Sequence, residues 1–208
     1  MSALEGLVRD ASSLGVPLTG EDAARLLALC ADLAEWNQRV NLTAITEPAA
    51  MITHHLLDSL AVHADLAGER IADVGTGAGF PGLPLALVNR QRQFTLIDST
   101  AKKLRFVEHA VQRLGLTNVT WVHARTEQLA VPPFDTIVAR AFAPLPVLLE
   151  RVTGLSNQAT QVLAMKGKWP AQELAAVRRG WRLASSRRLV IPGLDAERCV
   201  LALRRDIM

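Results

Sequence analysis

The stretch from Ile71 to Pro84, I-A-D-V-G-T-G-A-G-F-P-G-L-P, constrains the fold of this chain more than any other. Asp73 lies at the end of an apolar run, and glycines follow at alternate positions, Gly75, Gly77 and Gly79. This order predicts a buried strand that ends in a tight turn and opens a helix. Glycine lets the backbone approach a ligand closely because it has no Cβ, and the first N–H groups of a helix are free to bind polar groups. We therefore expect a ligand site at this turn.

Two classes of cofactor use such a turn. Gly77, Gly79 and Gly82 fit the G-x-G-x-x-G fingerprint of dinucleotide-binding proteins, and Asp98 follows about twenty residues later. The longer pattern adds an acid before the first glycine and a second acid at the end of the next strand. It is similar to motif I of S-adenosylmethionine (SAM) methyltransferases. A turn with glycines for packing alone is disfavoured, because three alternate glycines cost stability unless something approaches the backbone.

Length and composition limit the class of protein. A chain of 208 residues, half of them hydrophobic, can bury one sizeable core, so we expect one domain with an N-terminal extension. No window has the length of a membrane span, and the N-terminus lacks a signal-peptide pattern. Cys30 and Cys199 form neither a disulfide framework nor a zinc pattern, so we expect a cytoplasmic protein without a metal.

Charge is distributed unevenly along the chain. Residues 1–101 carry a net charge of −6 and residues 102–208 carry +9, so the total of +3 conceals a basic second half. Such a half suggests a polyanionic partner such as nucleic acid. An ordinary solvated surface of a basic protein explains the charge equally well, and composition leaves both interpretations open.

The order of predicted elements indicates an α/β fold. Helices are expected at 4–11, 19–39 and 48–66, and strands at 71–75, 93–98, 119–124, 135–140 and 161–166 with helices between them at 82–89, 101–114 and 145–155. A helix from Pro170 and two final strands at 187–191 and 198–204, joined by a turn at 192–195, complete the chain. The closing hairpin adds an antiparallel strand to a parallel sheet. We therefore predict a helical N-terminal extension, residues 1–66, and a ligand-binding domain, residues 67–208, with a seven-stranded mixed sheet. A dinucleotide-binding domain would instead continue with another parallel unit.

Several strings together resemble the RsmG (GidB) family of bacterial methyltransferases. They are W-N-Q-R-V-N-L-T from Trp36, H-x-x-D-S-L from His55, D-V-G-T-G-A-G-F-P-G-L-P-L-A from Asp73, F-T-L-I-D-S with K-K-L-R-F, F-D-T-I-V-A-R-A-F-A from Phe134, M-K-G from Met165 and P-G-L-D-A-E-R near the C-terminus. They follow the family order over nearly the whole chain. Ala139 stands where serine is common, which replaces one small residue by another.

The resemblance implies a class I SAM-dependent methyltransferase (Rossmann-like) fold, with SAM as cofactor. It implies methyl transfer to N7 of a guanine in 16S ribosomal RNA, in the 530-loop region of the small subunit, by a cytoplasmic monomer. The partner would be 16S rRNA or the small subunit, with no membrane and no metal. The alternatives are a SAM methyltransferase for another RNA or a small molecule, an NAD(P)-dependent oxidoreductase, and a nucleic-acid-binding module with a vestigial pocket.

Strand ends and the resemblance together nominate a cofactor site. Asp98, at the end of its strand, is placed to accept both ribose hydroxyls in charge-assisted hydrogen bonds. Asp73 is expected to orient the turn or meet the methionine end of SAM, next to the backbone of the three glycines. The resemblance adds further cofactor contacts, with Phe80 as an apolar wall and the adenine region near residues 126–127: Gly75, Phe80, Thr126, Glu127 and Arg140.

A second group of residues is expected to handle the substrate. Arg140 and Lys166 are nominated to position the reacting groups, and no general base is expected because guanine N7 has a free lone pair and no proton. Basic residues of the second half are candidates to hold phosphates: Lys166, Lys168, Arg187 and Arg188, with Arg178, Arg179 and Arg182 nearby. His54, His55 and Asp58 share one helix and lack a third metal ligand, so we expect a structural His–Asp hydrogen bond there.

Overall fold

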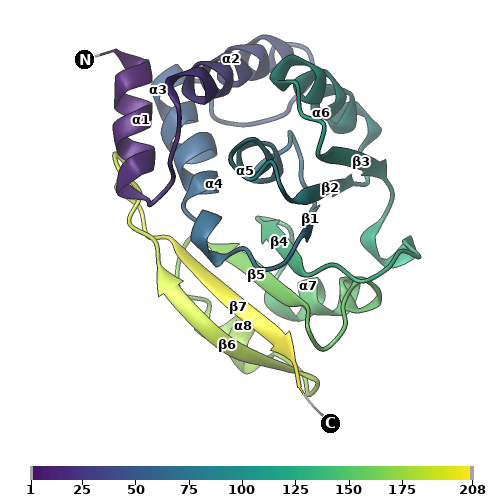
Figure 1. Ribbon diagram of the computed structural model, residues 1–208. Helices are drawn as coiled ribbons and strands as arrows, with labels where there is room; N and C mark the ends of the chain where they lie inside the picture. The colour runs from purple at the N-terminus through teal and green to yellow at the C-terminus, as the bar shows by residue number, and fades with distance from the viewer. Residues whose placement is uncertain (1, 207–208) are drawn as a thin grey trace.

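The computed structural model of the chain describes residues 2–206, in which a seven-stranded sheet lies between layers of helices (Figure 1). The strands are β1 (Arg70–Val74), β2 (Gln93–Asp98), β3 (Val119–His123), β4 (Thr136–Arg140), β5 (Gln161–Lys166), β6 (Trp181–Arg188) and β7 (Cys199–Arg205). The α-helices are α1 (Ala3–Ser13), α2 (Gly20–Asn37), α3 (Pro48–Met51), α4 (Asp58–Leu60), α5 (Gly82–Val88), α6 (Ala101–Leu114), α7 (Leu145–Arg151) and α8 (Ala171–Ala175). Four shorter helical segments complete the set: a π-helix, η1 (Ile52–Leu57), and three 3₁₀ turns, η2 (His63–Asp65), η3 (Thr126–Gln128) and η4 (Thr153–Leu155).

The order of strands in the sheet is β3-β2-β1-β4-β5-β7-β6. Strands β1 to β5 pair in parallel, whereas β7 lies antiparallel between β5 and β6. This arrangement confirms the predicted mixed sheet with a terminal antiparallel pair. The direction of strand order reverses between β1 and β4, and open α/β sheets bind ligands outside the carboxyl ends of strands at such a switch point. The glycine turn after β1 lies at this position.

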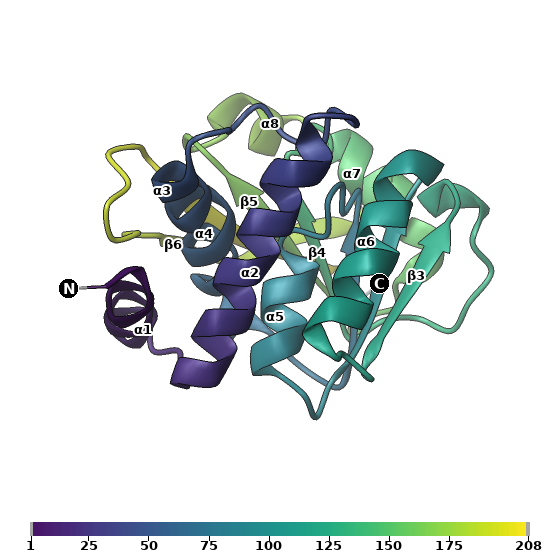
Figure 2. The same ribbon diagram turned by 90° about the horizontal axis from the view of Figure 1, so that it is seen from above.

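Successive side chains of each central strand point to opposite faces of the sheet, and each face is covered by its own hydrophobic core. Ile71 and Val138 face a core shared with α1, α2, α5 and α6, whereas Ala72 and Ile137 face a second core shared with α7. Figures 1 and 2 show α2, α5 and α6 on one face of the sheet and α7 and α8 on the other. Side chains of a strand point alternately to opposite faces, and a sheet covered on both sides therefore needs apolar residues at successive positions.

The N-terminal helices join the first of these cores. Ser2 and Glu5 form a capping box at α1, and Thr19 accepts a hydrogen bond from the Asp22 N–H at the start of α2. Leu26 of α2 is fully buried, and Trp36 packs edge-on against Phe106 of α6 with ring centroids 5.7 Å apart. The core is continuous across residue 66, so the division into 1–66 and 67–208 stays a prediction. Residues 1 and 208 themselves lie outside the described residues.

Two predicted elements differ from the structure. The segment 48–66 is not one helix, because a π-helical turn and a 3₁₀ turn interrupt it. The sixth strand spans Trp181–Arg188, not 187–191, and ten residues, not six, connect it to β7. Its residues are mostly exposed because β6 is the edge strand, so no burial pattern marks it in the sequence. Among residues 2–206, no helix has the length and apolar character needed to cross a membrane.

We expect the N-terminal helices and the sheet to unfold together. Leu26→Ala deletes a fully buried side chain and should lower the free energy of unfolding by about 2–5 kcal/mol. Urea unfolding followed by far-ultraviolet circular dichroism and by tryptophan fluorescence should show one coincident, shifted transition. Two separated transitions would contradict a shared core.

Candidate functional site

The turn after β1 is held in place by hydrogen bonds to β2. The N–H groups of Gly75 and Thr76 donate to the carbonyl oxygen of Ile97, at 2.8 and 3.1 Å, and the Gly77 N–H donates to Asp98 Oδ2 at 2.9 Å. Gly77 has a φ of +62°, which disfavours other residues. A Cβ placed on Gly77 would meet no protein atom closer than 4.0 Å, so its Cα faces open space rather than packed side chains.

Asp73 stabilises the turn through hydrogen bonds to both of its ends. Its Oδ2 accepts hydrogen bonds from Thr76 Oγ1 at 2.6 Å and from the Gly82 N–H at the start of α5 at 2.8 Å. Its Oδ1 is buried without a hydrogen-bond partner among the described residues. Burial raises the pKa of Asp73 to about 6, although the hydrogen bonds from Thr76 and Gly82 act in the opposite direction. A buried carboxylate with an unsatisfied oxygen is costly, and a cationic ligand group would relieve that cost.

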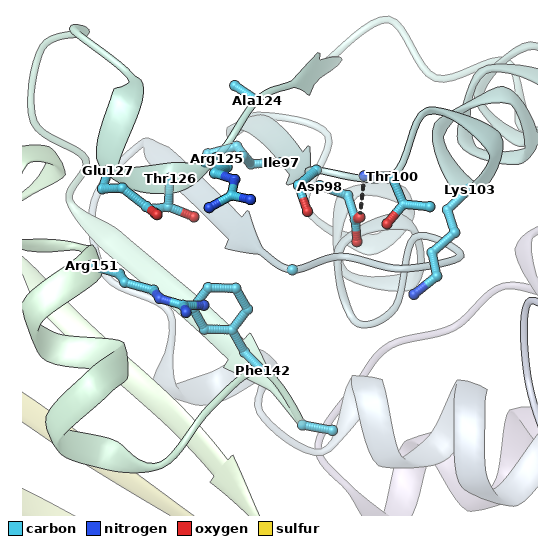
Figure 3. Close-up of a pocket in the computed structure, with 13 residues that line it drawn as sticks. Ile97, Asp98, Thr100, Lys103, Ala124, Arg125, Thr126, Glu127, Phe142 and Arg151 are labelled. Atoms are coloured by element: carbon cyan, nitrogen blue, oxygen red, sulfur yellow. Dashed lines mark hydrogen bonds between the residues drawn. The ribbon is translucent and has the colours of Figure 1, made fainter.

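A cavity of about 400 Å³ lies beside this turn (Figure 3). Its walls come from the end of β2, the segment after β3, the segment after β4 and Gly75. Asp98 and Thr100 line one side of it, and Thr126 and Glu127 line another. Each oxygen of the Asp98 carboxylate already accepts one backbone N–H, from Gly77 and Thr100, and each keeps a free lone pair. We call this space the β2–β3 cavity.

Phe142 closes one wall of the β2–β3 cavity. Its ring lies so close to Gly75 that a Cβ there would be 2.2 Å from the ring, and the Arg151 guanidinium lies over the ring at 5.4 Å (Figure 3). Gly75 also has a φ of +68°. Glycine at position 75 is therefore required by the neighbouring ring as well as by the backbone conformation.

A second cavity, of about 430 Å³, opens on the other side of Ala141. Arg140 and Lys166, from the ends of β4 and β5, line it together with Arg198 from the start of β7. His54, His55 and Asp58 form the wall that comes from η1 and α4. Ala141 lines both cavities and has a φ of +51°, unusual for a residue with a Cβ. We call this second space the β4–β5 cavity.

Asp58 connects the two arginines of the β4–β5 cavity. Arg140 Nη1 donates to Asp58 Oδ2 at 2.8 Å, and Arg198 Nε donates to Asp58 Oδ1 at 3.1 Å. Arg140 Nη1 also donates to the carbonyl oxygen of His54 at 2.8 Å. The Asp58 side chain is 4% exposed, so a single buried carboxylate fixes two guanidinium groups. The two arginines and Asp58 together leave an excess of one positive charge, whereas the charge of Lys166 is paired with Glu173 at 2.8 Å.

The predicted His–Asp hydrogen bond is wrong. His55 Nε2 instead pairs with Thr43 Oγ1 at 2.9 Å, and its ring stacks on Phe80 with centroids 4.9 Å apart. Burial and the Arg140 charge lower the pKa of His55 to about 4, so this histidine is neutral at pH 7. Within the described residues, no group of three or more His, Cys, Asp and Glu side chains could hold a metal ion.

The structure divides the residues nominated from the sequence. The β2–β3 cavity gathers Gly75, Asp98, Thr126 and Glu127. The β4–β5 cavity gathers Arg140 and Lys166. The remaining cofactor nominees, Asp73, Gly77, Gly79 and Phe80, support the turn and line neither cavity, and Phe80 is buried between His55 and the Arg140 guanidinium.

The phosphate candidates lie outside both cavities except for Lys166. Lys168 is exposed on the segment after β5, and Arg188 is exposed on β6. Arg187 is engaged elsewhere, because its Nη2 donates to Asp65 Oδ2 at 2.5 Å and to the carbonyl oxygen of Ala61 at 2.9 Å. Sequence reasoning did not single out Arg198, Phe142 or Arg151. The first two stand inside the quoted strings P-G-L-D-A-E-R and A-R-A-F-A, which were signals available in the sequence.

Comparison with known proteins identifies close relatives. Residues 22–202 match the model of the GidB family, described as rRNA small subunit methyltransferase G. A relative from Psychromonas ingrahamii is 39% identical over 206 residues, which cover 99% of this chain and 100% of the relative. One from Pseudomonas paraeruginosa is 44% identical over 202 residues, which cover 96% of this chain and 94% of the relative. Both are named ribosomal RNA small subunit methyltransferase G.

Solved structures share the fold. A SAM-dependent methyltransferase from Aquifex aeolicus superposes with a TM-score of 0.57 at 18% identity, covering 76% of this chain and 94% of that one. Magnesium protoporphyrin IX methyltransferase from Synechocystis, solved with bound SAM, has a TM-score of 0.60 at 14% identity, covering 85% and 97%. At these identities the similarity establishes a class I methyltransferase fold and nothing about the substrate.

We expect Asp58 to be essential for stability. Asp58→Ala leaves Arg140 and Arg198 facing each other without a counter-charge, and should cost about 3 kcal/mol of unfolding free energy, at the low end of the range for breaking a buried pair. The control is Glu21→Ala, which breaks the exposed Glu21–Arg25 pair and should cost under about 1 kcal/mol. Urea unfolding midpoints measure both. Equal costs for the two variants would mean that Asp58 has no special role.

Proposed function

This chain belongs to the rRNA small subunit methyltransferase G (GidB) family, and from that premise we propose that it transfers the methyl group of SAM to N7 of a guanine in 16S ribosomal RNA. The guanine lies in the 530-loop region that the family resemblance implies. A methyltransferase for another RNA or a small molecule, and an NAD(P)-dependent oxidoreductase, are not favoured.

The residues around the β2–β3 cavity fit SAM. The cavity volume of about 400 Å³ lies in the range of small-molecule sites. Asp73 does not line the cavity, but it lies beside the glycine turn, and its unpaired Oδ1 suits a cationic amino-acid group held against that turn. Asp98 would hold the ribose hydroxyls through its free lone pairs, and Thr126 and Glu127 would border the adenine. When bound, SAM supplies an electrophilic methyl group.

The β4–β5 cavity is proposed to receive the guanine. Arg140 and Arg198 share the single counter-charge of Asp58 and therefore give the cavity a positive charge that suits an RNA nucleotide. The donors of Arg140, Arg198 and Lys166 suit the guanine carbonyl oxygen or a phosphate. No side chain needs to remove a proton, because N7 carries none. The neutral His55 wall and the fixed arginines would instead hold the base in one orientation, and positioning alone can supply roughly 7–11 kcal/mol of rate enhancement at best.

One observation carries this proposal: two separately lined cavities meet at a single residue, Ala141. The first lies against the glycine turn and contains the carboxylates of Asp98 and Glu127 together with three cationic side chains. The second contains Arg140, Lys166 and Arg198 around the buried carboxylate of Asp58. A donor and an acceptor that occupy them would approach each other across Ala141, beside Arg140. A protein that binds one substrate needs one such cavity, so two cavities that share a lining residue favour a reaction between two bound molecules.

The experiment is to map 7-methylguanosine in 16S rRNA from cells with and without the gene. The proposal expects one modified guanine to become unmodified without the gene, and to regain its methyl group with wild-type protein but not with an Arg140→Ala variant. An unchanged modification pattern would overturn it. We further propose that the enzyme acts as a monomer in the cytoplasm, where small subunits are assembled.

Removing the Asp98 carboxylate should weaken SAM. Asp98→Ala deletes the ribose acceptor and the bonds to Gly77 and Thr100, so the Kd should rise about 10- to 150-fold, equivalent to roughly 1.5–3 kcal/mol. Isothermal titration calorimetry measures it, with Glu108→Ala, an exposed acid on α6, as the control. A change of less than about twofold in Asp98→Ala would remove Asp98 from the site.

SAM affinity should depend on pH through Asp73. The pKa of about 6 without ligand means that the carboxyl is protonated as the pH falls below that value, whereas a cationic ligand group favours its ionised form. Binding therefore releases a proton below pH 6, and affinity should rise from pH 5 to 7, by at most about tenfold per unit. Asp73→Asn should abolish this dependence. 5′-Methylthioadenosine lacks the amino-acid group and should bind equally at both pH values in the wild type, and a dependence for it would contradict the assignment.

A further inference from the structure

Trp169 is an exposed aromatic residue two positions after Gly167, which lines the β4–β5 cavity. Its side chain is 52% exposed, the highest value for an aromatic among the large exposed apolar residues of the described chain. Lys166 and Gly167 line the cavity, and Trp169 follows Gly167 by two positions, so their Cα atoms are at most about 7.6 Å apart. A ring in that place lies within the reach of one or two stacked nucleotides, at about 3.4 Å each, outside the cavity.

The segment that carries Trp169 is anchored on both sides. Lys166 Nζ donates to the carbonyl oxygen of Ala143 at 3.1 Å and to Glu173 Oε2 at 2.8 Å, which ties the end of β5 to α8. Pro170 is buried, and its carbonyl oxygen accepts the Leu174 N–H at 2.9 Å. The exposed ring is therefore presented by a fixed backbone, and a rigid aromatic side chain loses little conformational entropy when a partner packs on it.

The surroundings of Trp169 are cationic. Lys168 is exposed beside it, and Arg140, Lys166 and Arg198 lie in the adjacent cavity. Asp58 pairs with both arginines, Glu173 pairs with Lys166, and Glu197 precedes Arg198, so the four cations exceed these three acids by one charge. The other large apolar residues exposed in the described chain lie on different segments: Trp121, Val131, Leu183 and Val190. A lone aromatic among cations suits a nucleobase and its phosphate better than a protein surface, which needs a larger apolar area.

We propose that Trp169 is a stacking platform for a single-stranded base next to the target guanine, with Lys168 beside the phosphate of that nucleotide. Single-stranded RNA is commonly recognised by bases splayed onto aromatic side chains with the backbone held by cations. The inference rests on the proposed function, because it needs RNA as the substrate, and it adds a binding residue outside both cavities.

The test uses small ribosomal subunits from cells that lack the gene, methylated by purified protein. Trp169→Ala should raise KM for the subunits about 5- to 150-fold, the range for loss of one base–aromatic stack, while the Kd for SAM stays unchanged. Trp169→Phe should retain most of the activity. Trp121→Ala removes another exposed tryptophan, on the edge strand β3, which three strands separate from β5, and should behave as the wild type.

Two further readouts separate the outcomes. RNA should quench the tryptophan fluorescence of the wild type, and Trp169→Phe should lose that quenching. A KM unchanged by Trp169→Ala, while the wild type methylates the subunits, would overturn the platform and leave the proposed function intact. A wild-type self-association in sedimentation that Trp169→Ala abolishes would also overturn it, by assigning the ring to contacts between copies. Failure of the wild type to methylate subunits at all would count against the proposed function itself.

Discussion

The carboxylate of Asp58 is the interaction on which the rest of the site depends. It is buried, it comes from the N-terminal helical region, and it binds Arg140 of β4 and Arg198 of β7 at once. Because the two guanidinium groups share one counter-charge, the β4–β5 cavity keeps a net positive charge while its walls stay fixed. A buried ion pair contributes little net stability, but removing one partner leaves an unpaired buried charge and lowers the free energy of unfolding. Substitution of any one of these three residues should therefore be costly.

The glycine turn lies beside the other cavity that Ala141 lines, and two carboxylates fix its backbone. Asp73 accepts hydrogen bonds from Thr76 and Gly82, and Asp98 accepts one from Gly77. The Gly77 Cα still faces open space. Asp73 has one buried oxygen without a hydrogen-bond partner among the described residues, and burial raises its pKa, so a cationic group placed there would be favoured. The sheet places the glycine turn and the β4–β5 cavity at the carboxyl ends of β1, β2, β4 and β5, where the direction of strand order reverses.

Local sequence patterns predicted the regular part of the fold well. The strands 93–98 and 161–166 and the helix 101–114 were predicted with the bounds that the structure has, because burial and periodicity agree there. The edge strand β6 was misplaced because its exposed residues show no burial pattern. Partners far apart in sequence, such as Asp58 with Arg198, cannot be read from spacing, so the His–Asp expectation failed and Arg198 was missed. The π-helical turn before Asp58 likewise has no local signal in the sequence.

In the proposed function, the two cavities flanking Ala141 hold the two substrates separately. A crystal structure of the protein with S-adenosylhomocysteine and guanosine monophosphate tests it most directly. We expect the adenosine of the first ligand beside Asp98 and Thr126, and the guanine of the second beside Arg140 and Lys166. Density for S-adenosylhomocysteine in the cavity lined by Arg140, Lys166 and Arg198 would contradict the claim.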